Sequence, residues 1–175
     1  MPAKTVDPKT KSTAAPKARR PRIAFPKKNT PPTEAEFSAR LPLAAGKRLE
    51  MVRAFLKKQR GVAEDLYFYG PKTGWAYRYL RDAQQSIGSI MIHDERLLGI
   101  VALDPAATAA IDWGALSPVG QKAKKLAHGS PALIWIDVPL DGSGAADFKA
   151  VVKAKLATLA RVPPPPPAPG TPAPR

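Results

Sequence analysis

The sequence predicts an α+β fold, in which N-terminal, middle and C-terminal helices pack against a mainly antiparallel sheet of four to five strands. Two patterns indicate this class. The middle of the chain alternates apolar and polar residues with the two-residue period of strands, and turn residues divide it into two hairpins, with a later strand to follow. The flanking segments repeat apolar residues at helical spacing and begin with residues that cap helices.

The predicted domain begins with two helices. Thr33 and Glu36 form a capping-box pattern, which predicts a short helical turn at 34–40. A longer helix is expected at 42–59, because its apolar residues fall on one face and most of its lysines and arginines on another. Gly61 follows the basic last turn, which is typical of a helix end.

Two predicted hairpins come next. The first joins strands at 65–69 and 75–81 through the loop 70–74, which has a glycine at each end. The second joins strands at 86–93 and 97–103 through a short polar turn. Since consecutive strands in a hairpin are antiparallel, these four segments predict a meander.

Short helices, one more strand and a final helix complete the domain. Two pairs of an N-cap and a proline predict short helices, at Asp104-Pro105 and at Ser117-Pro118. The first helix is expected to run to about Asp112, and the second to end near His128. The apolar stretch 133–138 predicts a buried strand, and the helical pattern at 144–160 predicts the last helix.

Most of the net charge of +14 lies outside the predicted domain at 33–161. Residues 1–32 hold nine lysines and arginines against one aspartate and have little to bury, which predicts a disordered basic tail. Such a tail either binds DNA or RNA nonspecifically through salt-sensitive attraction or acts as a solubilising extension. Residues 162–175 predict a proline-rich disordered tail of polyproline II character, which either docks in a partner's aromatic groove or is an inert end.

Composition excludes several classes of site. The chain contains no cysteine, which rules out disulfides, thiolate zinc sites and iron–sulfur clusters.

No apolar run reaches the length of a membrane helix, and no apolar segment follows the basic N-terminus as a secretory signal requires. These features predict a cytoplasmic protein with no membrane partner. No nucleotide-binding loop, nucleophile elbow or metal-binding histidine pair is present, so no cofactor or metal is expected.

Aromatic residues concentrate in the first hairpin, where six of the twelve lie between Tyr67 and Tyr79. One interpretation is core packing through cross-strand aromatic pairs. The other is a partly exposed cleft that stacks on and hydrogen-bonds a ligand, because a tyrosine hydroxyl needs a polar partner. The cleft interpretation makes six residues candidates for ligand binding: Tyr67, Tyr69, Lys72, Trp75, Arg78 and Tyr79.

The segment from Tyr67 to Tyr79 reads YFYGPKTGWAYRY and resembles the hallmark hairpin of the domain of unknown function 3788 family. The resemblance extends more loosely over residues 42–160, through the two hairpins to the strand at 133–138 and the final helix. It implies the same order of helix, meander and helix, and it singles out the aromatic hairpin. The family has no established activity, so the resemblance implies no reaction.

Three polar residues elsewhere have alternative explanations. His93 is expected to close a strand, and His128 to lie in the last turn of a helix, where a cation complements the helix dipole. Neither has a neighbouring metal-ligand spacing, and no catalytic role is assigned to them. Asp137 lies in an apolar strand, where it is either buried and paired with Arg78 or Lys72, or exposed at a sheet edge.

Three function classes fit this sequence. The first is a non-enzymatic module that recognises a small ligand or a protein partner through the aromatic and basic hairpin. The second is a nucleic-acid-associated protein, whose basic tail supplies nonspecific affinity. The third is an enzyme without a cofactor that uses tyrosine and arginine groups, and it has the least support because no general base is evident.

Overall fold

The computed structural model describes residues 23–93 and 96–160. Six strands in this part of the chain form one sheet, and their bounds are β1 Val62–Phe68, β2 Trp75–Arg81, β3 Gln85–His93, β4 Arg96–Leu103, β5 His128–Ser130 and β6 Leu133–Pro139. All neighbouring strands are antiparallel, in the order β1-β2-β3-β4-β6-β5. Residues 1–22 of the predicted N-terminal tail and the whole predicted C-terminal tail, 162–175, lie outside the described residues.

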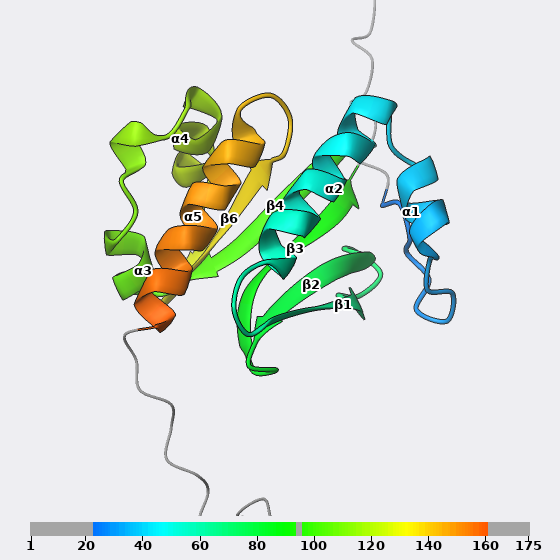
Figure 1. Ribbon diagram of the computed structural model, residues 1–175, viewed down its shortest axis with the longest axis horizontal. Coiled ribbons are helices and arrows are strands. Elements are labelled where there is room, and N and C mark those ends of the chain that lie inside the picture. The colour runs from blue at the N-terminus through cyan, green and yellow to red at the C-terminus, as the bar shows by residue number, and fades with distance from the viewer. Residues whose placement is uncertain (1–22, 94–95, 161–175) are drawn as a thin grey trace, which may run out of the picture.

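The helices of the described part are α1 Glu34–Ala39, α2 Leu43–Lys57, α3 Pro105–Ala109, α4 Pro118–Lys125 and α5 Gly144–Leu159, with one 3-10 turn, η1, at Trp113–Ala115. The longest two, α2 and α5, run across the same face of the sheet, α1 lies beyond α2, and α3 and α4 lie beyond α5 (Figure 1). This arrangement confirms the predicted α+β class. None of these helices is long and apolar enough to cross a membrane.

The predicted helix starts are confirmed. The Thr33 hydroxyl accepts the Glu36 amide, and the Glu36 carboxylate accepts the Thr33 amide, so the capping box is complete. The Asp104 carboxylate accepts the Ala107 amide at 2.7 Å, ahead of α3. These side chains satisfy amides in the first turn that have no partner within the helix.

The prediction for residues 126–130 was wrong. Helix α4 ends at Lys125, and His128 begins the short edge strand β5, where it lies opposite Trp135. Gly129 has a φ of +125°, and a Cβ there would collide with the Leu133 carbonyl oxygen. A strand of three residues is too short to show a two-residue period, so only the glycine could have indicated this turn.

Residues 23–32, predicted as part of the basic tail, instead lie against the fold. Ile23 forms a β-bridge with His93, and the Phe25 ring stacks on Phe37 with centroids 5.4 Å apart. The Trp75 amide donates to the Phe25 carbonyl oxygen at 3.3 Å. The run Ile23-Ala24-Phe25 supplies enough apolar surface to dock, although the composition of the whole tail conceals it.

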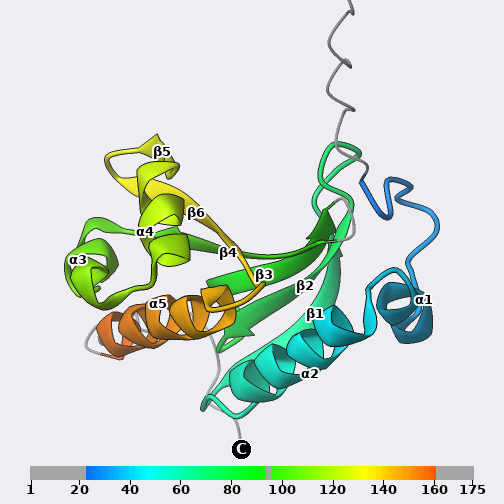
Figure 2. The same ribbon diagram turned by 90° about the horizontal axis from the view of Figure 1, so that it is seen from above.

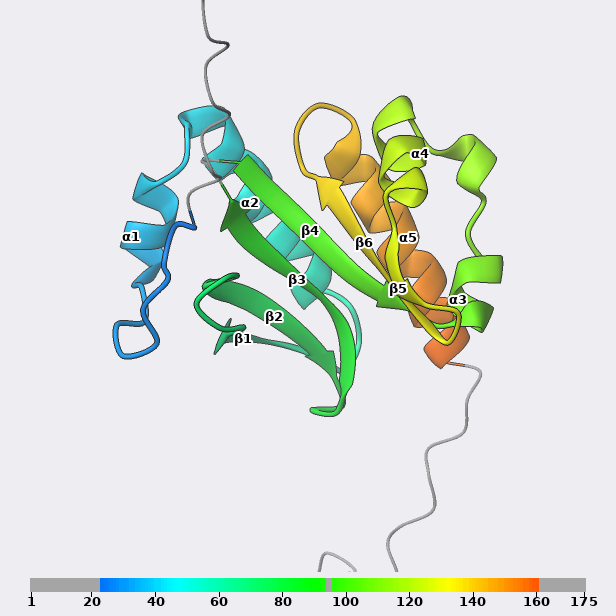
Figure 3. The ribbon, with the colours of Figure 1, turned by 180° about the vertical axis from the view of Figure 1, so that it is seen from behind.

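The core lies between the helices and one face of the sheet. Its fully buried members include Leu49 and Leu56 from α2, Phe148 from α5, and Val101 and Ile136 from the sheet. Helices α2 and α5 lie on this side of the sheet, while the opposite face of the sheet carries no helix (Figure 2). We call this opposite face the helix-free face; Figure 3 shows it from behind, with β3 and β4 at its centre.

Candidate functional site

The six candidate residues of the first hairpin divide between the two faces of the sheet. The register pairs Phe68 with Trp75 and Glu64 with Tyr79, and these side chains point toward the helices. The intervening pair, Asp65 and Arg78, points toward the helix-free face. Because side chains alternate along a strand, Tyr67 and Tyr69 lie on the same side as Arg78.

Tyr79 belongs to the core, as the packing interpretation of the hairpin expected. Its side chain is fully buried, and its hydroxyl donates to the Glu64 carboxylate at 2.7 Å. Burial and the neighbouring carboxylate both raise the pKa of the Tyr79 phenol, which keeps the proton on the donor. Glu64 also accepts two hydrogen bonds from buried Arg53, at 2.9 and 3.1 Å. This network ties α2 to β1 and β2 and leaves Tyr79 no access to a ligand.

Trp75 also lies on the helix side, as the first residue of β2. Its indole N–H donates to the Lys27 carbonyl oxygen at 2.9 Å, and its ring packs against Phe68 with centroids 5.5 Å apart. A Cβ at neighbouring Gly74 would approach the Phe25 carbonyl oxygen to 2.7 Å. Trp75 and the glycine beside it therefore hold the N-terminal segment in place.

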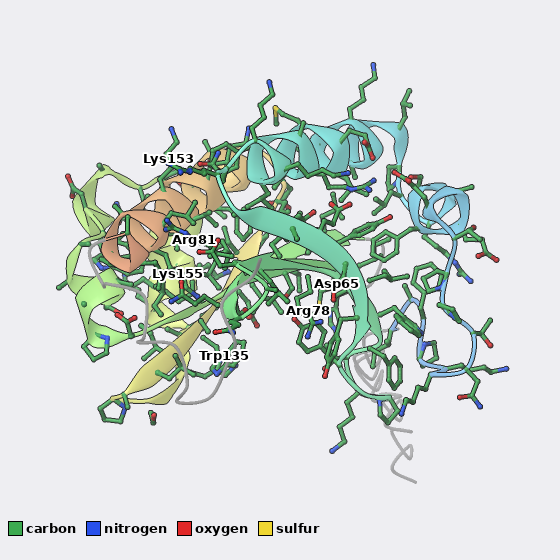
Figure 4. The ribbon with its side chains drawn as sticks, turned by 60° about the horizontal axis from the view of Figure 1, so that its bottom comes forward. Asp65, Arg78, Arg81, Trp135, Lys153 and Lys155 are labelled. Carbon is green, nitrogen blue, oxygen red and sulfur yellow. The ribbon has the colours of Figure 1, made fainter. Side chains whose placement is uncertain are left out.

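The other hairpin candidates gather on the helix-free face. Arg78 forms an ion pair with Asp65, with a 2.9 Å hydrogen bond from Nε to Oδ1, and its guanidinium lies 3.9 Å from the centroid of the Tyr67 ring. Figure 4 shows Arg78 and Asp65 pointing toward each other. The rings of Tyr67 and Tyr69 meet edge to face, 4.9 Å apart. Burial raises the pKa of the Tyr69 phenol, although the nearby Ser89 hydroxyl and Arg78 act in the opposite direction.

A hollow of about 370 Å³ lies on this face beside Tyr69. Its apolar floor comes from β3, β4 and β6 and consists of Met91, Leu98, Ile100 and Trp135. Its polar rim consists of Lys72, Thr73, Ser89, His93, His128 and Asp137. Lys72 and Thr73 reach it from the loop between β1 and β2, so two of the predicted site residues, Lys72 and Tyr69, line this hollow.

Sheet register assembles the hollow from distant parts of the chain. Ser89 lies opposite Ile100, and Ile100 lies opposite Asp137, so these three side chains project from neighbouring strands on one side. Trp135 occupies the same side of β6 two residues before Asp137, and its side chain is 37% exposed. Figure 4 shows Trp135 on the side of the sheet away from α5.

Both histidines of the chain line this hollow, which sequence reasoning did not anticipate. His93 ends β3 as predicted, whereas His128 was expected in a helix and lies in β5. The sequence contains one signal for this hollow. Period-two alternation at 133–138 indicates that Trp135 and Asp137 share a face of their strand. Within residues 23–93 and 96–160, no three side chains of the metal-binding types are grouped to hold an ion.

The predicted pairing of Asp137 with Arg78 was wrong, because Arg78 pairs with Asp65 instead. Asp137 is exposed and forms no ion pair within 4 Å in the described part of the chain. It does not lie at a sheet edge either, since β6 runs between β4 and β5. Its carboxylate shares the rim of the hollow with Lys72.

Comparison of the chain with models of known protein families, with curated proteins and with solved structures finds no match. The resemblance of the first hairpin to the domain of unknown function 3788 family therefore stays a prediction.

Proposed function

We propose that this protein is a small binding module without enzymatic activity, and that its site is the hollow on the helix-free face. The observation that supports this most directly is a hollow of about 370 Å³ with an apolar floor, an exposed tryptophan and a polar rim. Sites for small molecules have volumes of about 300–1,000 Å³ and combine apolar and aromatic walls with polar groups that fix orientation. This hollow shares that volume, but its lining is more polar, with six polar residues among eleven.

The lining residues indicate the kind of ligand. The exposed indole of Trp135 offers a face on which a planar ring stacks. The Lys72 ammonium suits an anionic group, and the Asp137 carboxylate accepts hydrogen bonds from an amine or a hydroxyl. We therefore expect a ring-bearing ligand with an acidic group at one end.

Binding without catalysis is proposed because the hollow lacks a coupled nucleophile and base. Within residues 23–93 and 96–160, neither His93 nor His128 forms a hydrogen bond with the Ser89 hydroxyl, the Tyr69 phenol or Asp137. Activated nucleophiles depend on such a hydrogen bond to the base that removes their proton.

The proposal is tested by nuclear magnetic resonance with a library of ring-bearing acids, with 4-hydroxybenzoate as the first probe. Backbone amide shifts are expected to change at Ser89, Ile100 and Asp137, and the changes are expected to weaken in a Trp135→Val variant. The matched control is Leu43→Ala, which truncates an exposed apolar side chain of α2 far from the hollow. A library in which no compound shifts the hollow, or in which Trp135→Val binds as well as the parent, would contradict the proposal.

A further inference from the structure

The rim of the hollow carries two opposite charges on different elements. Lys72 lies in the loop that joins β1 and β2, and Asp137 lies on β6. Both residues are exposed, and neither forms an ion pair in the described part of the chain, whereas Arg78 nearby is already paired with Asp65. One unpaired cation and one unpaired anion favour a ligand that carries both a carboxylate and an ammonium.

The order of the strands sets the distance between these two charges. The Lys72 loop ends at β2, which lies three strand steps from β6, or about 14 Å at ~4.8 Å per step. The span between the charged groups is shorter, because the long Lys72 side chain itself lines the hollow. A free amino acid carries both charges on one carbon atom and is too short. An extended peptide advances ~3.4 Å per residue, so three or four residues cover the span.

Trp135 determines which end of such a peptide carries a ring. It is exposed and lies two residues before Asp137 on the same side of β6, a separation of about 7 Å. A phenylalanine at the N-terminus holds its ring and its ammonium within one residue. The ring therefore reaches Trp135 when the ammonium meets Asp137. A ring on the last residue lies toward Lys72 and away from the indole.

The rest of the lining suits a peptide backbone. The hydroxyls of Tyr69, Thr73 and Ser89 line the hollow, and a hydroxyl both donates and accepts hydrogen bonds, as the N–H and C=O groups of a peptide require. The apolar floor between β3, β4 and β6 accommodates small apolar side chains. A volume of about 370 Å³ lies near the lower limit of small-molecule sites, which favours a short peptide over a long one.

We propose that the hollow binds free peptides of three or four residues that begin with an aromatic residue. The N-terminal ammonium pairs with Asp137, the first ring stacks on Trp135, and the C-terminal carboxylate pairs with Lys72. Because both ends of the ligand are recognised, an internal segment of a protein does not fit. The inference rests on the proposed function, since it names the ligand class of the same hollow.

The test is isothermal titration calorimetry of the full chain with the tripeptide phenylalanyl-alanyl-alanine. The matched control ligand is alanyl-alanyl-phenylalanine, which has the same composition and the same charges. The first tripeptide is expected to bind about two- to tenfold more tightly, the contribution of one aromatic pair, and Trp135→Val is expected to remove this preference. Phenylalanine alone is expected to bind more weakly than the first tripeptide, because it cannot reach both charges.

Capping the tripeptide tests each charge separately. N-acetylation removes the ammonium and C-terminal amidation removes the carboxylate, and each is expected to weaken binding to the parent about three- to tenfold. Acetylation is expected to have little effect in Asp137→Asn, and amidation little effect in Lys72→Gln, because the complementary charge is then missing. Asp141→Asn and Lys122→Gln are the matched controls. They remove exposed charges that do not line the hollow, so both capping effects are expected to persist.

Three results would overturn the inference. They are equal affinity for the two tripeptides, capped tripeptides that bind the parent as tightly as the free one, and capping effects that persist in Asp137→Asn and Lys72→Gln. If 4-hydroxybenzoate or another ring-bearing acid still shifts Ser89 and Asp137 in that case, the proposed small-ligand site stands and only the peptide ligand is wrong. If neither kind of probe acts at the hollow, both proposals fail.

Discussion

Lys155 gives the sharpest test of how this fold is stabilised. It lies on α5, only 6% of its side chain is exposed, and its ammonium donates to the Ala102 carbonyl oxygen at 2.6 Å (Figure 4). No carboxylate lies within 4 Å of it in the described part of the chain. Burial lowers the pKa of Lys155 from 10.5 to about 8, and Asp104 opposes this shift only partly.

The lowered pKa means that the folded state binds the proton less tightly than the unfolded chain does. Below pH 8 the buried charge therefore lowers the free energy of unfolding by about 3 kcal/mol. This reduction becomes smaller as the pH rises from about 8 to 10.5. A Lys155→Met substitution keeps most of the apolar stem and removes the charge. It also leaves the Ala102 carbonyl without its donor, which costs about 1–2 kcal/mol. We therefore expect the free energy of unfolding of Lys155→Met to exceed that of the parent by about 1–2 kcal/mol at pH 7.

The measurement is urea unfolding of the parent and the variant at pH 7, 9 and 10, followed by far-ultraviolet circular dichroism. The stability difference between the two proteins is expected to shrink and then reverse as the pH rises, because the parent amine becomes neutral. Lys153→Met, at an exposed lysine two residues earlier on α5, is the matched control and is expected to change stability by less than about 0.5 kcal/mol at every pH. If the variant is less stable at pH 7, or if the difference is independent of pH, the amine is not destabilised by burial.

Three further substitutions or deletions test the packing that positions the site. Glu64→Ala removes the least exposed of the three carboxylates that pair with buried Arg53, and also the acceptor of the Tyr79 hydroxyl, so it is expected to cost on the order of 3 kcal/mol in urea unfolding. Hydrogen bonds from Arg53 and Tyr79 outweigh burial and lower the pKa of Glu64. The loss is therefore expected to diminish as the pH falls below about 4, and an unchanged loss would contradict this reasoning. Gly99→Ala places a methyl group against the Phe148 ring and is expected to lower the free energy of unfolding by about 1–3 kcal/mol. Gly46→Ala is the control, because a Cβ there meets no atom within 4 Å, and it is expected to cause no such loss. Deletion of residues 1–32 is expected to lower the thermal midpoint more than deletion of 1–22, since only the longer deletion removes the Phe25 stack on the core; equal midpoints would refute the docking of this segment.

Local signals in the sequence were sufficient for most elements of the fold. Capping residues such as Thr33 and Asp104 mark helix starts, because the side chain must lie within a few residues of the amide it accepts. Side-chain alternation along β2 places Tyr79 and Arg78 on opposite faces of the sheet, and this alternation can be read from the sequence. Alternation does not show which face the helices cover, so the sequence alone leaves Tyr79 as a candidate for ligand binding. The structure removes it, because its hydroxyl donates to the Glu64 carboxylate on the helix side.

The hollow could not be predicted in the same way, because it depends on register between strands that are distant in the sequence. Ser89, Ile100 and Asp137 meet only because β3 pairs with β4, and β4 pairs with β6 across two helices. His128 joins them through β5, which has three residues and no detectable period. No property of these residues taken singly indicates that they share a site.

Strand β3 is buried on both of its faces, although helices cover only one face of the sheet (Figure 2). In a sheet with helices on one face only, strands normally alternate between buried apolar and exposed polar residues. In β3 every residue from Ile87 to Ile92 is buried, including Ser89 and Met91, whose side chains point away from the helices. The neighbouring strands and the loop that carries Lys72 shield this floor, while Trp135 at its side stays exposed. Because the β3 side chains are already buried, the apolar surface that a ligand would cover on this face belongs to Trp135 and to the half-buried Leu98 and Ile100.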